Sequence, residues 1–153
     1  MSNSPKISII ILTLNAYKMT REMLLNVADL QTKGMDVECL LVDNNSSDET
    51  AEKLANYKLP NMDYKFIETG ANLGFAGGNN VGIKDALERG ADYIILMNND
   101  LVLPRDILVV LTGFMEKSPE VGIASPKIYF APGYEFHKDR YQKDEIGKVI
   151  WYA

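Results

Sequence analysis

The chain has 153 residues, which fits one domain, and its 16 basic and 21 acidic residues give a net charge of −5. This mildly acidic balance argues against a dedicated nucleic-acid binder, because such proteins carry a basic face. The single cysteine, Cys39, and the single histidine, His137, exclude an internal disulfide framework and a metal site rich in cysteine or histidine. Any metal ion would have mostly oxygen ligands, which favours Mg²⁺ or Mn²⁺. The longest apolar stretch, residues 7–14, is too short to span a bilayer, and no signal-peptide cleavage site follows it.

Strand-like and helix-like patterns alternate along the chain. Residues 7–13 are nearly all apolar and mostly β-branched, as is typical of a strand buried on both faces of a parallel sheet. In chain order, the patterns predict a strand at 7–13, a helix at 17–30, a strand at 37–42, a helix at 47–57, a strand at 64–68, a helix at 79–89, a strand at 93–97, a helix at 104–115 and a strand at 121–128. This alternation predicts an α/β fold: a single Rossmann-like domain with a mainly parallel central sheet flanked by helices.

Local sequence patterns indicate where two of the helices begin. Ser46 and Glu49 have the spacing of a capping box, so the second helix is expected to begin at about Ser47. Residues 69–78 are rich in glycine and asparagine, and we expect them to form a loop that ends where the third helix begins.

The pattern weakens towards the end of the chain. Residues 133–153 are polar, charged and aromatic with little periodicity, and they are predicted to be an irregular tail. Residues 148–152 have the composition of a strand that is just beginning. We therefore expect residues 1–153 to form one domain that is the N-terminal part of a longer protein.

Polar segments follow four of the expected strands, at residues 13–15, 43–46, 72–80 and 98–100. Ligands of open parallel sheets bind beyond the carboxyl ends of the strands. All four segments are therefore expected to meet on one rim of the sheet, and this rim is the predicted binding site.

Several common chemistries lack their sequence signature. The first strand-to-helix turn contains no G-x-G-x-x-G fingerprint, and the chain has no Walker-type phosphate loop and no G-x-S-x-G element. A nicotinamide-dependent oxidoreductase, a P-loop nucleotidase and an α/β hydrolase are therefore not expected. Cys39 lies within an apolar strand and is predicted to be an inert core thiol, and His137 is predicted to have a surface or loop role.

Each candidate site element also has a structural interpretation. Asp43 could accept hydrogen bonds from a ligand, or it could only shape its turn. Gly77 and Gly78 could let the backbone approach a phosphate group, or they could let a helix pack closely on a strand. Asp100 could bind Mg²⁺ together with substrate phosphates, or it could be an ordinary turn residue.

Together, four ordered motifs at residues 9–15, 41–48, 72–83 and 96–100 resemble the nucleotide-binding half of a family 2 glycosyltransferase with the GT-A fold. The sequence Asn-Leu-Gly-Phe-Ala-Gly-Gly-Asn-Asn at 72–80 is most similar to the rhamnosyltransferase-like branch of that family. The resemblance covers about residues 6–129.

The resemblance implies a donor site for a nucleoside-diphosphate sugar, dTDP- or UDP-linked. Residues 13–15 would line the base pocket, Asp43 would hold the base, and the glycine segment would lie near the ribose and diphosphate. The donor-binding residues that it implies are Thr13, Leu14, Asn15, Asp43, Asn44, Asn72, Gly77, Gly78, Asn79 and Asn99. Many relatives have a second aspartate where this chain has Asn44, and of the family's Asp-x-Asp motif only Asp100 is present, as the expected ligand of Mg²⁺ or Mn²⁺.

The implied reaction is inverting, metal-assisted transfer of a hexose, with rhamnose as one candidate, to a hydroxyl group of a glycan or lipid-linked acceptor in bacterial cell-wall polysaccharide synthesis. The catalytic base of this family lies in the acceptor half, so it is expected beyond Ala153. The resemblance further implies a cytoplasmic protein, at the inner face of the membrane if the full-length protein associates with it peripherally. Two alternatives stay open: a nucleotidyltransferase that makes nucleotide sugars, and a nucleotide- or sugar-binding module without catalysis.

Overall fold

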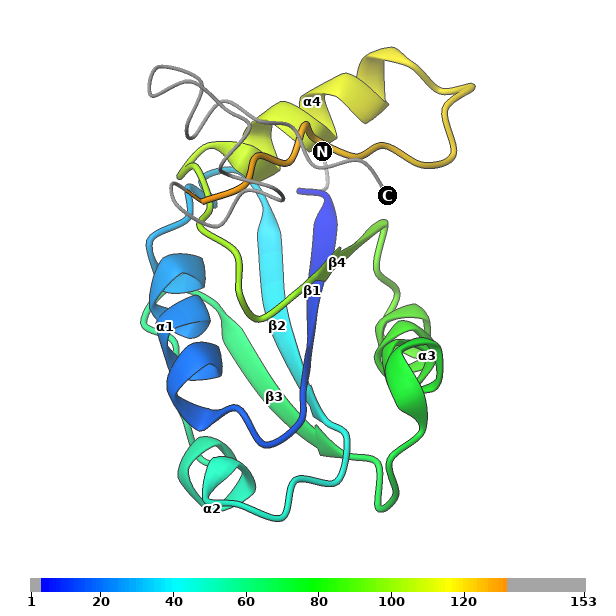
Figure 1. Ribbon diagram of the computed structural model, residues 1–153. Helices are drawn as coiled ribbons and strands as arrows, with labels where there is room; N and C mark the ends of the chain where they lie inside the picture. Colours follow the sequence, from blue (N-terminus) through cyan, green and yellow to red (C-terminus); the bar gives the residue numbers. More distant parts are fainter. Residues whose placement is uncertain (1–3, 132–153) are drawn as a thin grey trace, which may run out of the picture. The chain divides into compact units, whose positions relative to one another are not determined.

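The computed structural model describes residues 4–131 (Figure 1). These residues divide into two compact units with the boundary after Thr112. The first unit, residues 4–112, contains the whole sheet and the helices that cover it. The second unit, residues 113–131, contains the end of the last helix and the irregular segment that follows.

The sheet consists of four parallel strands in the order β3-β2-β1-β4. The strands are β1 (Lys6–Thr13), β2 (Asp36–Asp43), β3 (Asp63–Glu68) and β4 (Tyr93–Met97). β1 lies in the interior of the sheet, and all but one of its residues from Ile7 to Thr13 are buried. The register pairs Thr13 with Asp43, so these two residues end neighbouring strands at the same edge of the sheet. The predicted α/β fold with a mainly parallel sheet is confirmed.

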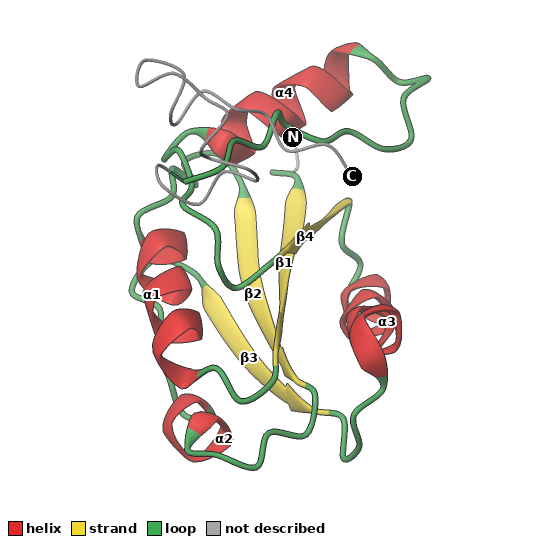
Figure 2. Cartoon of the chain, viewed as in Figure 1, coloured by secondary structure: helices red, strands yellow, loops and turns green. Residues whose placement is uncertain are grey.

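Helices cover both faces of this sheet (Figure 2). α1 (Tyr17–Ala28) and α2 (Thr50–Leu54) lie on one face, and α3 (Gly74–Glu88) lies on the other. The alternation of side chains along each strand separates the two cores. The first is formed by residues such as Ile9, Cys39 and Leu41 with the apolar side of α1, and the second by Ile10, Leu40, Val42 and Ala86.

α3 begins at Gly74, five residues before the expected start, so the second half of the segment predicted to be a loop, residues 74–78, belongs to the start of the helix. Glycines inside this helix face the sheet. A Cβ atom on Gly82 would lie 2.6 Å from Ile10 Cγ2 and 3.1 Å from Val42 Cγ2. The glycines therefore allow close helix-to-sheet packing, which outweighs their low helix propensity.

Two further expectations are wrong. The predicted capping box does not form, because Ser46 bonds to Asp43 instead, and α2 begins only at Thr50, whose N–H group donates to Asp48 Oδ1. Residues 121–128 form no strand, in keeping with Pro126, which lacks the N–H group that a strand ladder needs. The last helix, α4, is Ile107–Lys117, close to the expected range. The predicted tail at 133–153, including His137, lies outside the described residues.

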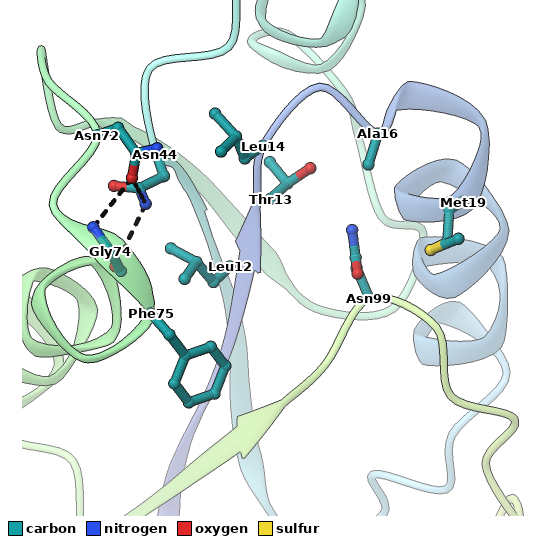
Figure 3. A pocket seen from close by; sticks show the side chains of 10 residues that line it. All are labelled: Leu12, Thr13, Leu14, Ala16, Met19, Asn44, Asn72, Gly74, Phe75 and Asn99. Carbon is teal, nitrogen blue, oxygen red and sulfur yellow. Dashed lines mark hydrogen bonds between the residues drawn. The ribbon is translucent and has the colours of Figure 1, made fainter. Parts of the chain in front are cut away.

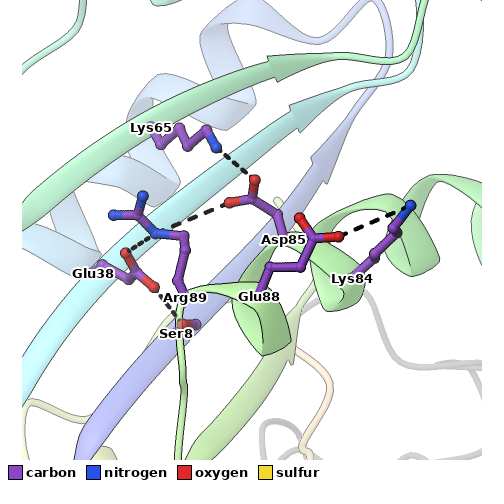
Figure 4. A network of polar contacts seen from close by, with 7 residues as sticks. All are labelled: Ser8, Glu38, Lys65, Lys84, Asp85, Glu88 and Arg89. Carbon is purple, nitrogen blue, oxygen red and sulfur yellow. Dashed lines mark hydrogen bonds and ion pairs between the residues drawn. The ribbon is translucent and has the colours of Figure 1, made fainter.

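An ionic network fixes the C-terminal end of α3 to the sheet, far from the strand ends that carry the candidate site (Figure 4). Glu38 is 3% exposed and accepts hydrogen bonds from Ser8 Oγ at 2.6 Å and from Arg89 Nε at 2.7 Å. The bond to Glu38 raises the pKa of Arg89. Lys65 and Asp85 form a second ion pair beside it. The hydrogen bonds and the ion pair compensate the buried Glu38 carboxylate, whose burial without partners would destabilise the folded state.

Among the described helices, none is both long and apolar enough to cross a membrane.

Candidate functional site

A pocket of about 440 Å³ opens at the carboxyl ends of β1 and β4, between the starts of α1 and α3 (Figure 3). This is the rim at which ligands of parallel sheets bind. All four strand-end segments contribute to its walls, although Asp43 itself is not among the lining residues. The lining residues are Leu12, Thr13, Leu14, Ala16, Met19, Asn44, Asn72, Gly74, Phe75 and Asn99. Five of the ten predicted donor-binding residues are thus brought together: Thr13, Leu14, Asn44, Asn72 and Asn99.

Asn44 organises the wall that precedes α3. Its side chain is 3% exposed, and its Nδ2 group donates to Asn72 Oδ1 at 2.9 Å and to Gly74 O at 3.3 Å. Its Oδ1 atom accepts the N–H group of Leu73 at 3.0 Å. A carboxylate could not make the two donated bonds, because it only accepts. The amide at this position therefore fits the local structure of this chain, whatever it contributes to a ligand.

Asp43 and Asn15 build the turn beside the pocket. The Asp43 carboxylate is 2% exposed and accepts bonds from the N–H and hydroxyl groups of Ser46. Asn15 has a positive φ of 50° and accepts the N–H group of Ser47 on its Oδ1 atom at 2.7 Å. These contacts favour the turn-shaping interpretation of Asp43 and show that Asn15 also stabilises this turn, and contact of either residue with a base remains a prediction.

A chain of hydrogen bonds joins the opposite wall to α1. Thr13 Oγ1 lies 2.7 Å from Thr20 Oγ1, and Asn99 Nδ2 donates to Thr20 Oγ1 at 3.1 Å. Thr20 was not among the predicted site residues. A signal for it existed, because it is a polar residue at helical spacing with the buried Met23, Leu24 and Val27.

Three predicted residues of the glycine segment, Gly77, Gly78 and Asn79, are not among the lining residues. A Cβ atom on Gly78 would clash with the Leu12 side chain, and one on Gly77 would lie 2.8 Å from Leu73 Cβ. Asn79 is buried, and its Nδ2 group donates to Phe75 O within α3. The packing interpretation explains Gly78, whereas Gly77 and Asn79 make their contacts within α3 and with Leu73 just before it. Of the segment after Asn72, only Gly74 and Phe75 line the pocket.

The lining residues that the sequence reasoning missed are mostly apolar, namely Leu12, Ala16, Met19 and Phe75. Apart from Leu14, the candidates were polar residues and glycines, so these apolar wall residues gave no signal. Binding pockets are nevertheless lined largely by apolar side chains with a few polar groups among them.

Asp100, the predicted metal ligand, is exposed and directly follows Asn99. Within residues 4–131, no group of three or more His, Cys, Asp or Glu side chains is arranged to hold a metal ion. Mg²⁺ usually binds one or two carboxylates, keeps several waters and takes further oxygens from a phosphate ligand. A single carboxylate at this rim fits such an ion only if a bound diphosphate completes its coordination.

The parallel sheet, the helices on both of its faces and the pocket at its carboxyl edge define an open α/β fold of the kind that binds ligands at this edge. The family model for Glycosyl transferase family 2 matches residues 8–151. The chain therefore belongs to glycosyltransferase family 2.

Individual relatives agree with this assignment. The chain is 28% identical over 116 residues to poly-beta-1,6-N-acetyl-D-glucosamine synthase of Staphylococcus epidermidis, an alignment that covers 76% of this chain and 27% of that protein. It is 33% identical over 93 residues to the low-salt glycan biosynthesis hexosyltransferase Agl10 of Haloferax volcanii, which covers 60% of this chain and 28% of the relative. The chain thus spans about a quarter of the length of these curated relatives.

A solved structure shares the fold. S. aureus TarS 1-349 in complex with UDP-GlcNAc superimposes with a TM-score of 0.64 at 22% sequence identity, over 80% of this chain and 37% of that chain.

Proposed function

We propose that this chain forms the donor-binding part of a glycosyltransferase that uses a UDP-linked hexose. The observation that carries the proposal is the pocket at the carboxyl ends of β1 and β4, where five of the implied donor-binding residues meet. The names of the relatives support hexose transfer, and the TarS complex, which shares the fold, supports UDP as the nucleotide.

The apolar and the polar residues of the pocket would contact different parts of the donor. Leu12, Leu14 and Met19 offer an apolar surface on which the base and ribose can bury area. The side chains of Asn72 and Asn99 offer amide groups for hydroxyl and phosphate oxygens. Asp100, at the open edge beyond Asn99, would hold Mg²⁺ or Mn²⁺ together with the diphosphate. A bound metal ion would offset the negative charge that develops on the leaving diphosphate.

The remaining parts of the reaction follow from the family resemblance. The acceptor would be a hydroxyl group of a glycan or of a lipid-linked saccharide, and transfer would invert the configuration at the sugar. The base that deprotonates the acceptor would come from the acceptor half that the family resemblance implies. We place the reaction on the cytoplasmic side of a membrane, where nucleotide sugars are the donors.

Calorimetric titration of the chain with UDP, dTDP and GDP tests the proposal. We expect UDP to bind more tightly than GDP, and UDP-hexose to bind at least as tightly as UDP. Tighter binding of dTDP than of UDP would replace the UDP assignment with a dTDP-linked donor such as a rhamnose donor. No binding of any nucleoside diphosphate, by a chain that is folded by circular dichroism, would overturn the proposal.

A further inference from the structure

We propose that Thr20 is a positioning residue for the donor site: its buried hydroxyl group holds Asn99 and thereby fixes the turn that carries Asp100. The inference rests on the proposed function, because it assigns a role to Thr20 in the binding of the same nucleoside diphosphate. Thr20 does not itself line the pocket.

The contacts connect three elements at one point. Thr20 lies in the first turn of α1 and is fully buried. Its hydroxyl group is 2.7 Å from the hydroxyl group of Thr13, the last residue of β1, and 3.1 Å from Asn99 Nδ2, beyond the end of β4. Both partners line the pocket, so the helix fixes two of its wall residues through one oxygen atom.

The Thr20 hydroxyl is used differently from a typical hydroxyl in a helix. Threonine inside a helix often bonds back to the carbonyl oxygen four residues earlier, and Thr112 does this with Leu108 O at 2.7 Å. In Thr20, the hydroxyl group instead reaches across to two strand ends. Removal of the Thr20 hydroxyl group would leave the buried Thr13 hydroxyl group and the Asn99 amide donor without this partner. An unpaired buried polar group costs more free energy than the net contribution of a satisfied hydrogen bond.

The position of Asn99 matters for its neighbour. Asp100 is the next residue, and it is exposed at the rim of the sheet. When the Asn99 side chain is fixed, the backbone of this turn is restricted, and the carboxylate is held near the pocket. If the Asn99 side chain were not held, the turn could sample other conformations. Ligand binding would then have to order the turn, and the conformational entropy lost would weaken the affinity.

The test uses calorimetry to compare the UDP affinity of the wild type with that of three variants, in the presence of Mn²⁺. Thr20→Val keeps the shape of the side chain and removes the hydroxyl group, and we expect UDP to bind about five- to tenfold more weakly, as befits one lost buried hydrogen bond. Thr20→Ser restores the hydroxyl group and is expected to bind within about twofold of the wild type. Thr112→Val is the matched control, a buried helical threonine away from the pocket, and it should leave the affinity unchanged.

A double-variant cycle separates positioning from general damage. If Thr20 acts through Asn99, then Thr20→Val together with Asn99→Ala binds UDP no more weakly than Asn99→Ala alone. Independent, multiplying losses would overturn the inference, and so would wild-type affinity of Thr20→Val or equal weakness of Thr20→Ser. If Thr20→Val does not fold, Thr20→Cys takes its place, because a thiol fills the site but is a weak hydrogen-bond acceptor. A wild-type chain that binds no UDP would instead overturn the proposed function, and the two failures are thereby distinguished.

Discussion

Asn44 Nδ2 lies 2.9 Å from Asn72 Oδ1, and this hydrogen bond joins the end of β2 to the segment that leads into α3. The same amide also accepts the N–H group of Leu73. One side chain therefore holds a whole wall of the pocket against the sheet. The family resemblance singled out this position as a departure from the common aspartate, and the contacts give the departure a physical reason in this chain.

Asn44→Asp should destabilise the protein at neutral pH by about 1–3 kcal/mol, because the buried carboxylate cannot donate to Asn72 Oδ1 or Gly74 O. The pKa of the introduced carboxyl group would be raised in the folded state by burial and by the two facing oxygens. The stability is therefore restored below the unfolded pKa of aspartate and lost as the pH rises through the folded pKa. Urea unfolding over this pH range measures the effect. Asn80→Asp, on an exposed position of α3, is the control, and equal stability of the two variants at neutral pH would contradict the account.

Gly82→Ala should cost about 1–3 kcal/mol of stability, because the added methyl group would meet Ile10 and Val42 of the sheet. The matched control is Gly113→Ala in α4, where a Cβ atom has nothing within 4 Å. That substitution should leave stability unchanged or raise it by up to about 1 kcal/mol, because alanine favours a helix over glycine. Denaturant unfolding of both variants measures the difference. Similar effects of the two substitutions would show that α3 does not pack as closely on the sheet as described.

Removal of the Arg89 guanidinium should show how much the buried Glu38 carboxylate destabilises the protein when no cation lies beside it. Arg89→Met keeps most of the side-chain length but leaves the carboxylate without its cation, and we expect a loss of about 2 kcal/mol, below the value for a fully buried pair because Arg89 is 38% exposed. Glu38→Gln in the Arg89→Met background removes the unpaired charge and should recover part of the loss. Thermal unfolding of the single and double variants tests this coupling, and a double variant less stable than Arg89→Met would contradict it.

The Cys39 thiol should be protected by its place in the core. Burial raises its pKa from 9.0 to about 12, so the folded state holds the thiol proton in a range where the unfolded state releases it. This contribution to stability is fully present below the unfolded pKa and is lost as the pH rises from about 9 towards 12. A thiol reagent should react with the folded chain far more slowly than with the chain in urea. Cys39→Ala should remove this part of the alkaline loss of stability. Rapid labelling of the folded chain at about pH 8, below the ordinary thiol pKa of 9.0, would contradict the buried placement.

The sequence predicts the fold well because β1, β2 and β4 are largely apolar runs, which are a strong signal for buried strands. The four strands of the sheet lie within one residue of their expected limits. The start of α3 was missed for a physical reason: glycine favours loops in isolation, but Gly78 and Gly82 are needed where the helix approaches Leu12 and Ile10. Contacts between distant segments outweigh local propensity there, and a single sequence does not reveal them.

The candidate site was predictable to the extent that strand ends meet. Thr13, Asn44 and Asn99 could be grouped because each follows or ends a parallel strand. The contacts that hold them could not be predicted, because Thr20 and Asn72 reach them from a helix and a loop whose packing depends on the whole fold. The turn-shaping bonds of Asp43 were foreseen only as one of two interpretations.

The most direct test of the account is to map where UDP binds, from the shifts of backbone amide resonances of the isotope-labelled chain as UDP is added. The account predicts that the largest shifts cluster at residues 12–16, 44, 72–75 and 99–100, around the pocket at the carboxyl ends of β1 and β4. Residues of the Glu38–Arg89 network, at the other end of α3, should stay unchanged. Shifts confined to another surface, or no shifts at a UDP concentration that saturates relatives of this family, would contradict the central claim that this pocket is the donor site.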